Sequence, residues 1–166
     1  MLLEHFTCSS MKKAALITVG RIKTVFWQKA AAHYRERLVR SGFRIEETVI
    51  KDADAELCAE TKIATEGEKI MAALPSGYTN ICLDARGQNL DSVNFAELLR
   101  QCEERARPPC FIIGGAYGLS GLVLEKTHQI LSLGKMTFPH ELAQIILWEQ
   151  LFRADAIRRK TGYHHE

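Results

Sequence analysis

The sequence lacks the marks of a membrane, secreted or zinc-binding protein. No apolar run is long enough to cross a bilayer as a helix. The first ten residues have neither the basic start nor the long apolar stretch of a signal peptide. The five cysteines form no C-x-x-C pair, which argues against a zinc site and against a disulfide framework. We expect a protein of the reducing cytoplasm that holds no metal and contacts no membrane.

Acidic residues are almost missing from the first third of the chain, although the net charge is only +2. Nine lysines and arginines lie between Lys12 and Arg44, and only Glu36 opposes them. From Glu46 to Lys69 the balance reverses, with eight acids against three lysines. A basic segment of this kind is able to follow nucleic-acid phosphates. A solvated helix face balanced by a neighbouring acidic segment explains the same pattern, and charge alone favours this second interpretation.

The glycine-rich stretch IIGGAYGLSG, residues 112–121, lacks the spacing of the known phosphate-binding loops. Ala116 stands where the pattern G-x-G-x-x-G needs its second glycine, and Leu119 and Ser120 stand where the P-loop needs Gly and Lys. The dinucleotide fingerprint also belongs in the first strand–helix unit, whereas this loop belongs to the fourth. A phosphate site is therefore weakly supported, and a tight turn with close helix packing explains the glycines as well.

What the sequence does contain is a regular alternation of short apolar runs and helical patterns. The predicted strands span 14–19, 43–50, 79–84, 110–115 and 129–134, and the predicted helices span 25–40, 53–74, 91–105, 120–127 and 139–159. This alternation predicts an α/β fold, in which helices flank a largely parallel sheet. The length fits one domain. We place it at residues 11–166, with residues 1–10 as an N-terminal extension, because Met11 begins a second plausible start.

The last predicted helix is apolar on nearly every side, which is typical of a buried helix and often of one between subunits. Glu149 falls within its apolar face, and Arg153 follows four residues later, in the favourable orientation for an ion pair. Such a pair is needed because an unpaired buried charge is costly. The pair serves either to hold the structure or to position reacting groups. Tyr163 and His164 in the tail, and His140 at the helix start, are further candidates, although a frayed terminus is common.

Taken together, these residues resemble the large-subunit ribosomal RNA methyltransferase H family of the SPOUT class. The resemblance covers residues 11–166 and rests on motifs in a fixed order. These motifs are MKKAALITVGRIK, Glu66-Gly67-Glu68, ICLDARG, IGGAYGLS, LSLGKMTFPH, EQLFRA and the terminal YHH. Each motif alone is weak, but their joint order and spacing in so short a chain are specific.

The resemblance implies a fold and an activity that the residue patterns alone do not predict. The fold is a parallel α/β sheet whose C-terminal part is tied into a trefoil knot, a feature that is nearly absent from other proteins. The implied activity is methyl transfer from S-adenosylmethionine to N3 of a pseudouridine in 23S rRNA, within the assembled ribosome. The implied partners are a second copy of the chain, as a homodimer, and the ribosome.

Carried over residue by residue, the resemblance also implies the sites. The cofactor-binding positions are Leu83, Gly114, Leu133, Gly134, Lys135, Met136, Thr137 and Phe138. We expect Lys135 to contribute its backbone and to point its side chain away, because an ammonium repels the sulfonium of the cofactor. The positions near the reacting atoms are His140, Glu149, Arg153, Tyr163 and His164. We expect His164, or a water that it holds, to accept the proton from the target nitrogen.

Two positions depart from the family pattern. Gly162 replaces a proline that many members have before the tail tyrosine, and His165 replaces an arginine or lysine after the tail histidine. Both changes affect the tail and neither touches the cofactor segments. Two other functions stay open: a SPOUT methyltransferase that acts on another RNA, and a non-catalytic RNA-binding assembly factor that has kept the fold.

Overall fold

The computed structural model describes residues 12–164 of the chain. The extension at residues 1–10 and the departure at His165 lie outside these residues. Five strands and five helices follow one another along the described chain. They are β1 (Lys12–Val19), α1 (Val25–Arg40), β2 (Phe43–Ile50), α2 (Ala59–Ala73), β3 (Thr79–Asn89), α3 (Ser92–Glu104), β4 (Pro109–Ile113), α4 (Gly121–Glu125), β5 (Gln129–Ser132) and α5 (His140–Arg158).

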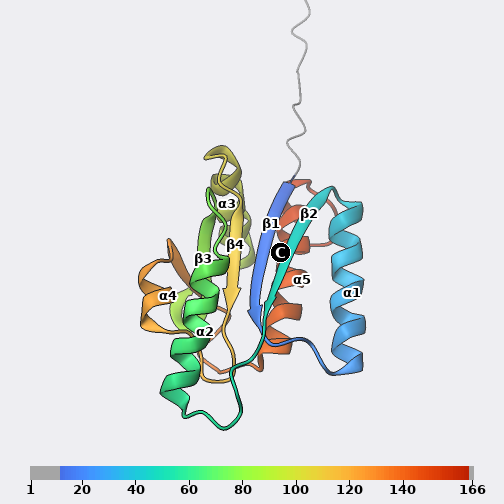
Figure 1. The fold of residues 1–166 in the computed structure, drawn as a ribbon. Helices are drawn as coiled ribbons and strands as arrows, with labels where there is room; N and C mark the ends of the chain where they lie inside the picture. The colour runs from blue at the N-terminus through green and yellow to red at the C-terminus, as the bar shows by residue number, and fades with distance from the viewer. Residues whose placement is uncertain (1–11, 165–166) are drawn as a thin grey trace, which may run out of the picture.

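All five strands join one parallel sheet in the order β2-β1-β4-β3-β5. Helices α1, α3 and α5 pack on one face of this sheet, and α2 and α4 pack on the other. Figure 1 shows this division, with α1 and α5 to one side of the strands and α2 and α4 to the other. The predicted parallel α/β sheet flanked by helices is confirmed.

Two separate cores explain why the strands are apolar on both faces. Along β1, Leu16 contributes to the core under α1, α3 and α5, whereas Ile17 contributes to the core under α2 and α4. Alternate residues of a strand point to opposite faces, so a strand covered on both sides needs a continuous apolar run. Helix α5 supplies the largest share of the first core, including the fully buried Trp148 and Leu151. Its predicted burial is confirmed within a single chain.

The acidic segment neutralises part of the basic first third, as the second interpretation of the charges requires. Arg35 on α1 pairs with Glu47 on β2, and Lys13 on β1 pairs with Glu46, at 2.5 and 3.1 Å. Lys12 pairs with the fully buried carboxylate of Asp155 on α5. These pairs leave a smaller set of basic side chains free to meet a ligand.

Two predicted boundaries differ from the structure more than the others do. The second helix begins at Ala59 rather than at residue 53, because residues 51–58 form an irregular segment that the helix itself holds: Glu66 on α2 accepts a hydrogen bond from the backbone N–H of Ala53 at 3.0 Å. Strand β3 continues to Asn89 rather than ending at residue 84. Its second half pairs again with β5 after a break in register.

The double pairing of β3 with β5 brings two backbones into close contact. Leu131 of β5 lies opposite Leu83 and also opposite Gln88, so residues 84–87 bulge out of the ladder between the two strands. A Cβ atom on Gly87 would lie 2.6 Å from backbone atoms of Ile130 and Leu131. Backbone atoms cannot move aside as a flexible side chain does, so only glycine fits at this position.

We predict that Gly87→Ala destabilises the protein by about 1–3 kcal/mol, the usual cost of inserting an atom into a packed site. Gly121→Ala is the matched control, because a Cβ on Gly121 meets nothing within 4 Å. Urea unfolding of both variants provides the measurement. Equal midpoints for the two variants would show that the β3–β5 contact is looser than described.

Candidate active site

The predicted site segments meet at one edge of the sheet, where the strands end. Leu133 follows β5 directly, Gly114 follows β4, and Leu83 lies in β3 just before its break in register. Ligands of parallel α/β sheets bind outside the carboxyl ends of the strands. The fold therefore gathers three segments that are far apart in the sequence.

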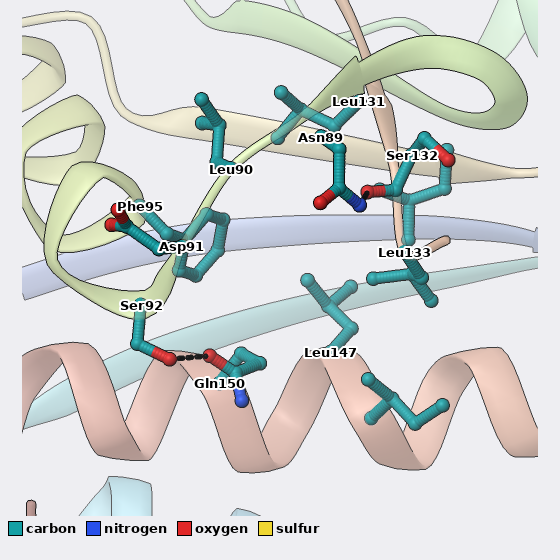
Figure 2. A pocket seen from close by; sticks show the side chains of 12 residues that line it. Asn89, Leu90, Asp91, Ser92, Phe95, Leu131, Ser132, Leu133, Leu147 and Gln150 are labelled. Carbon is teal, nitrogen blue, oxygen red and sulfur yellow. Dashed lines mark hydrogen bonds between the residues drawn. The ribbon is translucent and has the colours of Figure 1, made fainter. Parts of the chain in front are cut away.

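A cavity of about 340 Å³ opens between the end of β5, the second half of β3, and helices α3 and α5. Figure 2 shows Leu90, Phe95, Leu131, Leu133 and Leu147 around it. A smaller cavity of about 70 Å³ shares the side chains of Leu83 and Leu133 with the first. Together the two cavities, here named the Leu83–Leu133 cavity, form an apolar cleft with a few polar groups, the usual form of a small-molecule site.

The charged side chains that line the Leu83–Leu133 cavity are carboxylates. Asp91 lines the larger part and Asp84 the smaller part, while the described residues contribute no lysine or arginine to either wall. Hydrogen bonds from Arg86 hold the pKa of Asp84 below its usual value, so this carboxylate stays ionised at neutral pH. Both carboxylates also have partners within the protein, because Asp84 pairs with Arg86 at 2.8 Å and Asp91 accepts from the backbone N–H of Asn94 at 2.7 Å. Walls that carry carboxylates and no described cation still suit a cationic ligand better than an anion.

The predicted cofactor residues divide into three groups. Leu83, Leu133, Gly134 and Phe138 line the cavity. Gly114 is buried behind it: a Cβ on Gly114 would lie 2.7 Å from the carbonyl oxygen of Gly118, so the loop's own backbone fills that space. The remaining three are exposed side chains outside both cavities: Lys135, Met136 and Thr137.

A cluster of polar and aromatic side chains lies on the outer face of α5. Arg153 donates to Glu149 through Nε at 2.9 Å and through a terminal nitrogen at 2.5 Å, which forms the predicted ion pair. The Tyr163 hydroxyl donates to the same carboxylate at 3.2 Å. Its ring packs edge-on against Phe152 and lies beneath the guanidinium of Arg37. The tail is therefore anchored as far as Tyr163 rather than frayed.

The phenol of Tyr163 is neutral at neutral pH. Burial, assisted by a hydrogen bond with Tyr34, raises the pKa of Tyr163 to about 12. The hydroxyl therefore acts as a hydrogen-bond donor, and it does not serve as a base near pH 7.

Two residues that the sequence analysis missed connect this cluster to the cavity. Gln150 lines the cavity and donates from Nε2 to Glu149 at 2.7 Å. Its Oε1 accepts a hydrogen bond from the Ser92 hydroxyl at 2.8 Å, as Figure 2 shows. Gln150 directly follows Glu149 in the sequence, and that adjacency is the one signal that pointed to it.

The two predicted histidines lie apart from the cavity walls. His140 opens α5, and its Nε2 atom is buried near Gly20 without a hydrogen-bond partner among residues 12–164. His164 is half-buried beyond Tyr163, and its Nδ1 likewise has no partner in the described part of the chain. Within one chain, therefore, neither histidine lines the Leu83–Leu133 cavity.

Two other features, a membrane-spanning helix and a metal site, are absent from the described residues. No helix among them is both long and apolar enough to span a membrane. Residues 12–164 also contain no group of three or more His, Cys, Asp or Glu side chains that could hold a metal ion.

Comparison with known proteins identifies the family. The family model described as "Predicted SPOUT methyltransferase" matches residues 12–164. The chain belongs to the SPOUT methyltransferase family. The "Ribosomal RNA large subunit methyltransferase H" of Nitratidesulfovibrio vulgaris (strain DSM 19637 / Miyazaki F) is 49% identical over 156 residues, which cover 93% of this chain and 100% of that protein. The protein of the same name from Oleidesulfovibrio alaskensis is 48% identical over 93% of this chain and 100% of its own length.

The fold of this chain also agrees with that of a solved methyltransferase structure. A "Probable Methyltransferase from Bordetella pertussis Tohama I" superposes with a TM-score of 0.55 at 15% sequence identity. The match covers 87% of this chain and 96% of that one. The resemblance stated from the sequence motifs is thus confirmed at the level of the family.

We predict that Tyr163 makes stability fall as the pH rises from about 10 to about 12. The pKa of the phenol is 10.0 without the protein environment and about 12 in the folded chain. Between these values the unfolded chain has lost the proton and the folded chain keeps it. The free energy of unfolding therefore falls as the pH rises.

The measurement is the free energy of unfolding at several pH values for the parent protein and for Tyr163→Phe. The variant keeps the ring contacts and the other tyrosines. Its free energy of unfolding should therefore fall less steeply with pH between about 10 and about 12. Parallel curves would mean that Tyr163 is not held in the contacts described.

Proposed function

We propose that this protein is an S-adenosylmethionine-dependent methyltransferase that methylates N3 of a pseudouridine in 23S rRNA within the ribosome. Near-full-length identity of 49% to a relative named as a large-subunit ribosomal RNA methyltransferase is the observation that carries this proposal. The family match, which names the chemistry, and the carboxylate-lined cavity support it.

The Leu83–Leu133 cavity fits S-adenosylmethionine in size and charge. The apolar walls accept the adenine, and a cavity lined by Asp84 and Asp91 but by no described lysine or arginine suits a positively charged sulfonium. Leu83, Leu133, Gly134 and Phe138 hold the cofactor by side-chain contact and backbone. Exposure of Lys135 agrees with its side chain pointing away from the sulfur.

When bound, S-adenosylmethionine supplies a methyl group on a positively charged sulfur. The protein's part is to hold the target nitrogen in line with that methyl group and to take up the proton that the nitrogen loses. We assign the proton to His164 or to a water that it holds. Glu149 and Arg153 organise the surrounding pocket, with His140 at its edge, and the neutral hydroxyl of Tyr163 contacts the target base.

Four further features belong to the same proposal. Residues 11–166 form one domain, and membership of the SPOUT family is the ground for a C-terminal trefoil knot. The protein acts as a homodimer in the cytoplasm. A second copy would supply further residues to the cavity, because neither His140 nor His164 lines it within one chain.

The direct test is transfer of labelled methyl groups to ribosomes that lack this modification, followed by mass mapping of the 23S rRNA. We expect one modified pseudouridine. His164→Ala and Tyr163→Phe should each lower the turnover, and His164→Ala should lower it by about 10²–10⁴-fold if that residue is the base. Unchanged turnover in both variants would disprove the roles assigned to the tail.

The same experiment separates the rival functions. Methylation of another RNA would point to a different target for the same chemistry. A protein that binds ribosomes, but neither binds S-adenosylmethionine nor transfers label, would be an assembly factor.

The charge of the cavity gives a separate prediction. Asp84→Lys should weaken the binding of S-adenosylmethionine by about tenfold, because a charge reversal near the sulfonium costs on the order of 1.4 kcal/mol. The same substitution should weaken the binding of S-adenosylhomocysteine less, since the sulfur of that compound is neutral. Titration calorimetry of both ligands provides the measurement.

Glu125→Lys is the matched control, because Glu125 is exposed at the end of α4 and lines neither part of the cavity. Equal losses for the two ligands in Asp84→Lys would remove the electrostatic argument for a sulfonium in this cavity.

A further inference from the structure

A second hollow lies at the same edge of the sheet, where β1 and β2 end. It has a volume of about 570 Å³ and is formed by residues 20–23, residues 49–52 and Gln28. A narrower cavity of about 210 Å³ shares part of this wall and continues inward to Gln144 on α5. We name the two together the basic hollow. Its size lies within the range of sites that enclose a small ligand or a single nucleotide.

The charge of the basic hollow is opposite to that of the Leu83–Leu133 cavity. Arg21, Lys23 and Lys51 line its outer part, with Asp52 as the one acid there. Lys23 lies 3.8 Å from Asp52, whereas Arg21 and Lys51 form no ion pair with any described residue. Two basic side chains are therefore available to an anion from solution.

A buried amide faces the inner part of the basic hollow. Gln144 is only 5% exposed, and its Nε2 atom has no hydrogen-bond partner among residues 12–164. A buried donor without a partner destabilises a fold by roughly 1–3 kcal/mol, so such a group usually has an acceptor supplied from elsewhere. The hollow thus presents cations at its mouth and, beside the Arg35–Glu47 ion pair of its inner wall, a donor without a partner among residues 12–164.

The basic hollow is fixed to the helix that follows the cofactor segment. The backbone N–H of Lys23 donates to Glu141 in the first turn of α5 at 2.6 Å. Gly20 permits this approach: its φ is +80°, and a Cβ there would lie 2.7 Å from Asp52 and 3.4 Å from His140. His140 and Glu141 follow the segment 133–138 almost directly. A ligand that occupies the hollow therefore lies close to the start of α5, beside the cofactor segment.

We propose that the basic hollow binds the sugar–phosphate backbone of the rRNA strand beside the target nucleotide. Arg21 and Lys51 contact phosphates, and Gln144 donates a hydrogen bond to an oxygen of the ribose or the base. This inference rests on the proposed function, because it takes the substrate to be RNA. It also gives Arg21, which belongs to the basic segment between Lys12 and Arg44, a role beyond ion pairs within the protein.

The test compares two double variants of the full chain. Arg21→Gln with Lys51→Gln removes the two unpaired cations of the hollow. Arg105→Gln with Lys126→Gln removes two exposed cations that line neither part of the hollow. Binding to unmodified large ribosomal subunits is measured between low and high salt, together with KM and kcat for methylation and the affinity for S-adenosylmethionine.

Loss of two phosphate contacts should reduce the slope of log affinity against log salt by about 1.4–1.8. KM for ribosomal subunits should rise about tenfold in the hollow variant, with kcat and the affinity for S-adenosylmethionine unchanged. The control pair should match the parent protein in all four quantities. An unchanged slope and KM in the hollow variant, or an equal change in the control pair, would overturn the inference.

Gln144→Leu separates a binding role from a structural one. If Gln144 meets an RNA oxygen, this variant should raise KM while leaving the protein at least as stable, because it removes a buried donor without a partner. A loss of stability with KM unchanged would show that Gln144 serves the fold alone. If the parent protein transfers no methyl group at all, the proposed function fails, whereas the salt slope still decides whether the hollow binds RNA.

Discussion

The close contact between β3 and β5 is the constraint on which the site depends. Residues 84–87 bulge out of the β3–β5 ladder, and a Cβ on Gly87 would lie 2.6 Å from backbone atoms of Ile130 and Leu131. After this break the second half of β3 pairs with β5 again, and Asn89 and Leu90 line the same cavity as Leu133. A plain parallel sheet ending at Leu83 would leave the same apolar side chains without the cavity between them.

Charge divides the carboxyl edge of the sheet into two regions. The Leu83–Leu133 cavity is lined by carboxylates, whereas the described residues line the basic hollow with four cations and two acids, of which Arg35 and Glu47 pair with each other. Methyl transfer to RNA brings together a cationic donor and an anionic acceptor strand, so the two regions match the two substrates in sign. Helix α5 contributes to both regions. Glu141 in its first turn accepts a hydrogen bond from the backbone N–H of Lys23 in the hollow, and Gln150 further along the helix lines the cavity.

Much of the fold was predictable from local patterns. The alternation of apolar strands and helices fixed the elements to within a few residues, except at α2 and β3. Both exceptions depend on contacts distant in sequence, namely Glu66 with Ala53 and Gln88 with Leu131. Helical spacing alone predicted the Glu149–Arg153 pair, because its partners are four residues apart. Spacing does not reveal Gln150 as a link to the cavity, nor Gln144 as a buried donor, since both depend on how α5 packs.

The cofactor-binding residues and the role of each site residue came from the resemblance to a family rather than from physical reasoning on the sequence, and these roles stay predictions. The most direct measurement is a crystal structure of the protein with S-adenosylmethionine bound. Our account predicts the adenine between Leu83 and Leu133, and the sulfonium on the side of Asp84, away from Arg21 and Lys51. Cofactor bound in the basic hollow, or a Leu83–Leu133 cavity left empty at saturating ligand, would contradict it.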